Sequence, residues 1–78
     1  LNPNFAKAYG NRGVAYSKKG DSDKAIADDT EAIRLKPDDA AAYHNRGIAY
    51  QKKGDAAKAE SDFERAKVLG YKSKSTPK

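Results

Sequence analysis

Few side chains in this sequence are of the types that carry out catalysis or hold metal ions. His44 is the only histidine and there is no cysteine, so a triad, a dyad or a zinc cluster would have to be built from carboxylates alone. The acidic runs DSD at 21–23 and DDTE at 28–31 lack the glycine turn and the distal glutamate of a calcium loop. The sequence therefore predicts no catalytic site, no metal and no cofactor.

Composition indicates one small domain with a thin core. The chain has 78 residues, of which 37% are hydrophobic and 35% charged, and a chain this short buries only about 60% of its unfolded surface. No apolar run approaches the roughly 18 residues of a membrane span. The six glycines form neither a GxGxxG motif nor a P-loop, so no phosphate cradle is expected. Without cysteine, the redox compartment cannot be read from the sequence.

The chain contains an internal repeat. NRGVAYSKKGD at 11–21 returns as NRGIAYQKKGD at 45–55, and residues 5–35 match residues 39–69 at 17 of 31 positions without a gap. Such self-similarity is typical of a supersecondary unit that cannot bury its apolar face alone and stacks on copies of itself.

Apolar residues recur with helical spacing in each copy, as Tyr9, Gly13 and Tyr16 do on one face. Gly20 and Gly54 can end helices in the left-handed conformation, with Asp21 or Ser22 and Asp55 capping the next ones. Pro37 ends another helix, and Asp38 or Asp39 caps its successor. We predict an all-α fold with helices near 5–19, 22–35, 39–53 and 56–69, as two helix-turn-helix repeats of an α-solenoid.

The residues at fixed positions in both copies resemble the tetratricopeptide repeat, whose period is 34. The first copy supplies Tyr9, Gly13, Tyr16, Ala25, Ala32 and Pro37, and the second supplies Tyr43, Gly47, Tyr50, Ala59, Phe63 and Ala66. The sequence departs from the family pattern in that Arg12 and Arg46 stand where leucine is usual, Tyr71 stands at the second proline position, and Asp29 replaces the aromatic residue.

Asp29 is the most unusual of these departures, because an acid on an apolar stripe is costly unless it is paired. Two interpretations are open. In one, Asp29 lies at the edge of the stripe and is wetted; in the other, it hydrogen-bonds to a tyrosine hydroxyl or to an arginine.

The ends of the chain suggest four parts. LNPN at 1–4 aligns with LKPD at 35–38, so we expect residues 1–4 to be the end of an upstream repeat, followed by repeats at 5–38 and 39–69. Glu60, Ser61 and Lys67 replace the more apolar Ile26, Ala27 and Ile33, which predicts a terminal repeat with a polar outer face. Residues 70–78 are predicted to be a flexible basic tail.

Charge is distributed unevenly between the predicted helices. The first helix of each copy carries lysine and arginine without an acid, whereas the acids lie in the second helices. Part of this pattern follows from helix dipoles, which favour Lys18, Lys19, Lys52 and Lys53 at helix C-termini. Whether the dipole explains all of it is left open by the sequence.

The resemblance implies that the first helices line a groove in which extended peptides bind. Carried over position by position, that groove contains Lys7, Asn11, Val14, Lys18, His44, Asn45, Ile48 and Lys52. Asn11 and Asn45 would clamp a peptide backbone, or alternatively cap a turn or bond a neighbouring helix. Asn45 also matches an asparagine of the carboxylate clamp of chaperone-binding members, but Gly10 and Val14 stand at two other clamp positions.

The sequence therefore predicts a non-enzymatic module that binds a protein or peptide, with an acidic segment favoured. One alternative is a scaffold that self-associates through the front of the first helix, near Phe5 and Ala8, as a homodimer or a domain-swapped oligomer. Weak nucleic-acid binding through the basic face and tail is a second alternative. It is disfavoured because much of the net charge of +5 lies in the tail and no aromatic platform accompanies the bases.

Overall fold

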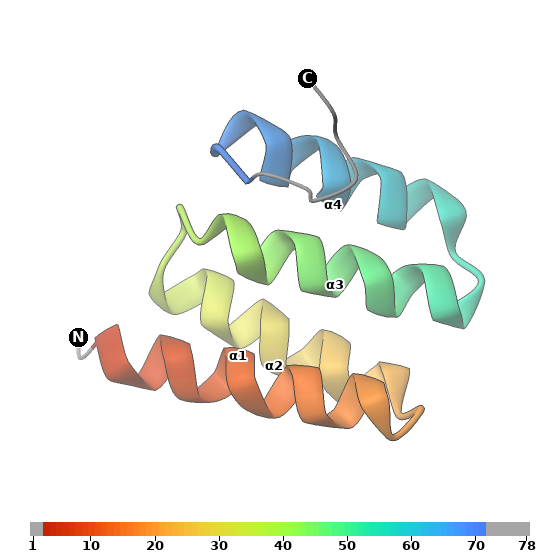
Figure 1. The fold of residues 1–78 in the computed structure, drawn as a ribbon, viewed down its shortest axis with the longest axis horizontal. Coiled ribbons are helices and arrows are strands. Elements are labelled where there is room, and N and C mark those ends of the chain that lie inside the picture. Colours follow the sequence, from red (N-terminus) through yellow and green to blue (C-terminus); the bar gives the residue numbers. More distant parts are fainter. Residues whose placement is uncertain (1–2, 72–78) are drawn as a thin grey trace.

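The computed structural model describes residues 3–71, which form four helices and no strand. The helices are α1 (Pro3–Lys18), α2 (Ser22–Leu35), α3 (Ala40–Lys53) and α4 (Ala56–Val68), as Figure 1 shows. The predicted all-α fold is confirmed. The predicted basic tail lies almost wholly outside the described residues.

Aspartates and glycines set the helix ends as the sequence predicts. Asp21, Asp39 and Asp55 are the N-caps of α2, α3 and α4, and each side chain accepts a hydrogen bond from the backbone N–H three residues on. Gly20 and Gly54 have φ of 88° and 94°, a conformation that costs glycine little. These turns reverse the chain tightly, so consecutive helices are antiparallel.

The first helix begins earlier than predicted. Pro3 is helical, whereas its counterpart Pro37 lies in the turn between α2 and α3. Proline is favoured in the first turn of a helix, where its missing N–H would have no partner. The same residue type can therefore open one helix and follow the end of another.

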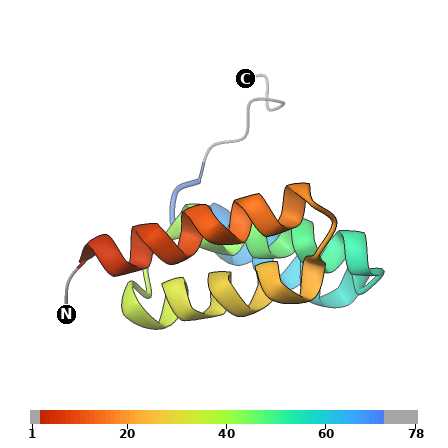
Figure 2. The same ribbon diagram turned by 90° about the horizontal axis from the view of Figure 1, so that it is seen from below.

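The helices form two antiparallel hairpins, which we call the first hairpin (α1 and α2) and the second hairpin (α3 and α4). In Figure 1, α1 and α3 lie on the near side with α2 behind them, and Figure 2 shows α1 and α2 in separate layers. Within the described residues, α2 packs against both α1 and α3, while α1 meets α3 only briefly and does not touch α4. The near face of α1 and α3 is therefore left open for other contacts.

Alanines make up most of the core, as they allow the helices to approach closely. The fully buried apolar residues are Ala6, Ala25, Ala32, Ala42, Ala49, Ala59 and Ala66. Gly13 and Gly47 stand at the tightest crossings, where a β-carbon would lie 2.6 Å from Asp29 Oδ1 and 2.7 Å from Phe63 Cε1, respectively. Glycine is thus required in both hairpins by proximity rather than by an unusual φ.

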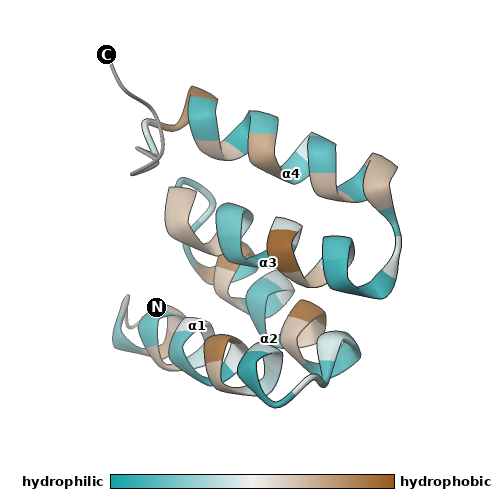
Figure 3. Cartoon of the chain, turned by 45° about the vertical axis from the view of Figure 1, so that its right-hand side comes forward, coloured by the Kyte–Doolittle hydropathy of each residue, from teal (hydrophilic) through white to brown (hydrophobic). Residues whose placement is uncertain are grey.

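Hydrophilic residues cover most of each helix, with short hydrophobic segments between them (Figure 3). No helix in residues 3–71 has both the length and the apolar character needed to cross a membrane.

Candidate functional site

A bidentate ion pair ties the two helices of each hairpin together. In the first hairpin, Arg12 donates from Nε and Nη2 to Asp28 at 2.7 and 2.9 Å. In the second, Arg46 donates to Asp62 at 2.8 and 2.9 Å. The arginines that depart from the family pattern therefore have a structural role, and a planar fork matched to a carboxylate suits arginine rather than lysine.

These ion pairs were not predicted, although the sequence contains a signal for them. Arg12 and Arg46 both precede an aspartate by 16 residues, and both members recur after 34 residues. The pairs also reduce the free positive charge on α1 and α3, because both arginines are neutralised within the fold. Lys53 is likewise paired, with Asp23 at 2.7 Å.

The structure shows that both interpretations of Asp29 are wrong. It is 1% exposed, so it is not wetted at the edge of a stripe, and its Oδ1 atom has no hydrogen-bond partner in the described part of the chain. Burial, followed by the nearby charge of Asp28, raises the pKa of the Asp29 carboxyl to about 7. Arg46 acts in the opposite direction but donates its hydrogen bonds to Asp62 and Thr30 instead.

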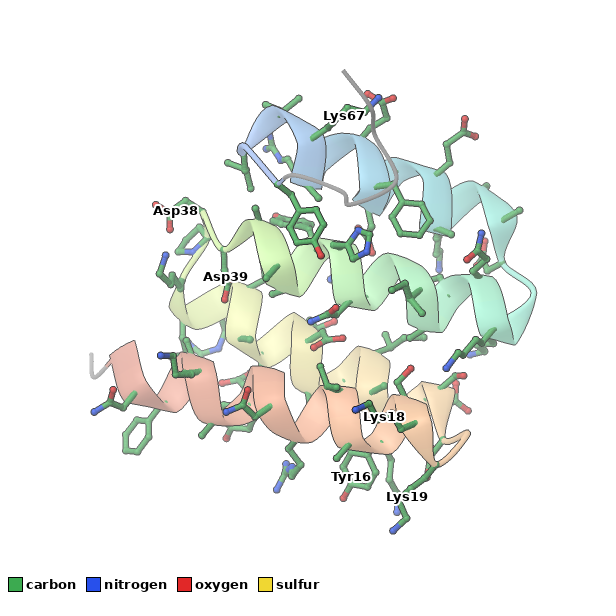
Figure 4. All side chains as sticks on the ribbon, in the orientation of Figure 1. Tyr16, Lys18, Lys19, Asp38, Asp39 and Lys67 are labelled. Carbon is green, nitrogen blue, oxygen red and sulfur yellow. The ribbon has the colours of Figure 1, made fainter. Side chains whose placement is uncertain are left out.

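A hollow of about 440 Å³ lies between α1 and α3 near the start of both helices. Four of the predicted groove residues line it: Lys7, Asn11, Val14 and Asn45. The remaining lining comes from Asn4, Ala6, Gly10, Lys36, Asp39, Ala41 and Ala42. Figure 4 places Asp39 at the beginning of α3, at the end of the molecule where this hollow lies.

The turn between α2 and α3 contributes to the hollow through Lys36 and Asp39, which the sequence analysis did not include. The predicted groove residues all come from the first helix of each copy. The KPDD turn lies directly before α3, and this position in the sequence could have indicated that its side chains reach the open end of the groove.

The other four predicted residues do not line this hollow. Lys18 is exposed towards the far end of α1 (Figure 4), and Lys52 donates to the carbonyl of Ser17 at 3.2 Å. Ile48 is half-buried on α3. The predicted groove is therefore divided, with its hollow at one end and its lysine-rich rim at the other.

His44 belongs to an aromatic cluster. Its ring stacks on Tyr71 with centroids 4.2 Å apart and an interplanar angle of 16°, and it meets Phe63 at 5.3 Å. Tyr71 reaches it because Gly70, with φ of 99°, turns the chain back after α4. Burial lowers the pKa of His44, so the ring is neutral at pH 7 and largely occupied by contacts within the chain.

Lys7 is the cation of the hollow that is available to a ligand. Within residues 3–71, no carboxylate lies within ion-pair distance of Lys7. Lys36, in contrast, donates to Asp38 at 3.1 Å, and Asp39 accepts from the backbone of Ala42. In the described part of the chain, no group of three or more His, Cys, Asp or Glu residues is placed to hold a metal ion.

The outer side of α1 is more exposed than the equivalent side of α3. Ala42 and Ala49 are 2% and 0% exposed because α2 covers them, whereas their counterparts Ala8 and Ala15 are exposed. The Arg12 side chain is 60% exposed and that of Arg46 is 18%. Tyr16 and Lys19 point away from α3 on this side (Figure 4). We call Phe5, Ala8, Arg12 and Ala15 the front face.

Two stacked helical hairpins with close glycine crossings and an open face define the class of helical repeat proteins. Comparison with known families makes the assignment specific. Profiles described as tetratricopeptide repeat match residues 1–27 and 40–70, and one described as TPR repeat matches residues 18–54. The chain belongs to the tetratricopeptide repeat family. No curated protein matches the chain. Repeats of this family generally bind proteins or peptides and are generally non-catalytic.

Proposed function

We propose that this chain is a non-catalytic module that binds an extended acidic peptide along the groove between α1 and α3. The observation that carries the proposal is the hollow in that groove, with Lys7 on its rim and without a carboxylate partner among the described residues. An acidic side chain of the ligand would provide that partner. Neither α1 nor α3 contains an acid, so the helices themselves do not repel such a ligand.

Asn11 and Asn45 support an extended peptide as the ligand. Asn11 comes from α1 and Asn45 from α3, and both line the hollow. A side-chain amide can donate and accept at the same time, which matches the alternating N–H and C=O groups of a peptide backbone. The two amides would hold the main chain while Lys7 selects the charge.

The affinity is expected to be modest. The groove between α1 and α3 is short, and its main charge, Lys7, is exposed. We therefore expect a Kd in the micromolar range or weaker, which is a binding free energy of about −8 kcal/mol or less in magnitude. Because exposed charges are screened within about 10 Å at 0.1 M salt, binding should weaken as salt is added.

The test is fluorescence anisotropy with a labelled glutamate-rich peptide and its lysine-rich counterpart. Lys7→Glu should weaken binding of the acidic peptide by roughly tenfold, while Lys58→Glu, on α4, makes the same charge change away from the groove and should have little effect. Lys52→Glu then measures whether the ligand extends to the far end of the groove. Equal binding of both peptides, or equal effects of Lys7→Glu and Lys58→Glu, would contradict the proposal.

Self-association is a second candidate, favoured by the front face. Phe5 is 58% exposed, and together with Ala8, Tyr9 and Arg12 it lines a hollow of about 260 Å³. A second copy that covered this surface would bury it as α2 buries the matching side of α3. Sedimentation equilibrium should then show association that Phe5→Glu reduces; a monomer at millimolar concentration would exclude this function.

A further inference from the structure

The two hairpins differ next to the groove at three matched positions. In the second hairpin, His44 contacts the rings of Phe63 and Tyr71. The residues 34 positions earlier are Gly10, Asp29 and Pro37, and none of them is aromatic. The second hairpin therefore has a cluster of rings at these positions, and the first hairpin has none.

Gly10 faces open space in the groove. A β-carbon at Gly10 would meet no atom of residues 3–71 within 4 Å, whereas one at Gly13 would meet Asp29 Oδ1 at 2.6 Å. Gly10 also lines the hollow of about 440 Å³, a volume within the roughly 300–1,000 Å³ of pockets that hold small ligands. The space above Gly10 is thus not needed for helix packing and is free to receive a ligand group.

The surfaces around this space suit a side chain that is apolar and lies beside a negative charge. Val14, Ala41 and Ala42 present apolar surface to it, and Lys7 lies on its rim. Asp39 is the one carboxylate in the lining, and it already accepts a hydrogen bond from the Ala42 backbone at 3.2 Å. A flat ring would bury more apolar area on such a surface than a small aliphatic group would, because aromatic side chains bury the largest apolar area.

We infer that the hollow above Gly10 receives an aromatic side chain of the bound peptide, adjacent to the acidic residue that pairs with Lys7. The ligand ring lies above Gly10, the residue that matches His44 of the second hairpin. This inference rests on the proposed function and narrows it, from any acidic segment to one in which an aromatic residue neighbours an acid.

The experiment compares two labelled peptides that differ at one position, a glutamate-rich peptide with a central phenylalanine and the same peptide with alanine. Anisotropy titrations should give a Kd about tenfold lower for the phenylalanine peptide. Gly10→His introduces the residue of the second hairpin and should remove most of that tenfold difference, because the imidazole occupies the hollow. The alanine peptide has no ring to lose, so Gly10→His should weaken its binding less than that of the phenylalanine peptide.

Controls separate the hollow from the fold. Gly10→Ala adds only a methyl group and should preserve most of the discrimination, and circular dichroism checks that both variants keep their helices. If neither peptide binds the original chain, the proposed function fails and the inference with it. If both bind equally, or if Gly10→His weakens both to the same extent, the inference is overturned while acidic-peptide binding in the groove stands.

Discussion

The helices of the first and second hairpins are held together by the same contacts, but a different residue fills the space between them. Both have a glycine at the closest crossing and a bidentate arginine–aspartate pair. Asp29 and Phe63, however, occupy matching positions and differ in chemistry. Phe63 supplies a ring in the second hairpin, whereas Asp29 in the first is a buried carboxyl whose Oδ1 has no partner among the described residues. The comparison separates two tasks: small residues and ion pairs set the geometry, whereas the filling residue sets the stability.

Exchanging the filling residues should have the largest effect. Asp29→Phe removes an unpartnered buried oxygen and adds apolar surface, so we expect the free energy of unfolding to rise by about 2 kcal/mol. Phe63→Asp, made in that stabilised background, should lower it by about 3 kcal/mol. Urea titrations followed by circular dichroism measure both changes.

A matched control for this exchange is Ala27→Gln, which alters an exposed residue two positions before Asp29 on α2. Its effect on the unfolding free energy should be below that of either exchange. Destabilisation by Asp29→Phe would mean that the first hairpin has no room for a ring, and the two hairpins would then differ in geometry as well as in filling.

The ion pairs provide a second, smaller contrast. Arg46 also donates from Nη1 to Thr30 at 3.1 Å and is covered by α2, whereas Arg12 is open to solvent. Because screening weakens exposed pairs, double-mutant cycles should give a coupling of about 2 kcal/mol for Arg46 with Asp62 and a smaller coupling for Arg12 with Asp28. Equal couplings would show that cover by α2 adds nothing to the pair.

The smallest expected effect is a pH dependence that belongs to the first hairpin. The pKa of Asp29 is raised from 3.8 to about 7 by burial and by Asp28, with Asp39 and Asp62 adding to the rise and Arg46 opposing it. The folded chain therefore holds a proton that the unfolded chain releases, and stability falls as the pH rises from about 4 to about 7.

We expect Asp29→Asn to reduce the loss of unfolding free energy between pH 6 and pH 8 by about 1 kcal/mol. The lowered pKa of His44 acts in the opposite sense, so His44 is kept in both proteins. Asp38→Asn serves as a control, because Lys36 lowers the pKa of this exposed carboxyl. An unchanged slope in Asp29→Asn would show that another group carries the pH dependence.

Helices and their ends were predictable because they depend on neighbours in sequence. Period, capping aspartates and left-handed glycines are local signals, and they located three of the four helices within one residue at each end. The exception is α1, where Pro3 was interpreted by analogy with Pro37 although its place in the chain allows it to open a helix.

The candidate site was less predictable because it depends on which side chains already have partners. The sequence counted Arg12 and Arg46 among the basic residues of the first helices, but both are paired within the hairpins, and the predicted groove residue His44 stacks on Tyr71. The state of Asp29 also could not be read from its spacing, since the stripe position indicates burial but not whether a donor lies within reach. Helix periodicity places Lys7, Asn11 and Val14 on one face of α1, and the stacking of repeats that the family resemblance implied brings Asn45 of α3 beside them.

Gly10 has a consequence for how such proteins diverge. A side chain introduced at Gly10 would project into the groove without disturbing the close crossing of α1 and α2, since its β-carbon meets no atom of the described residues within 4 Å. If the groove binds peptides as proposed, a single codon change at this position would alter ligand preference without a compensating change elsewhere. The histidine at the matching position of the second hairpin shows that duplicated hairpins accept different residues there. Arrays of this kind can acquire new specificities one hairpin at a time while the scaffold is inherited unchanged.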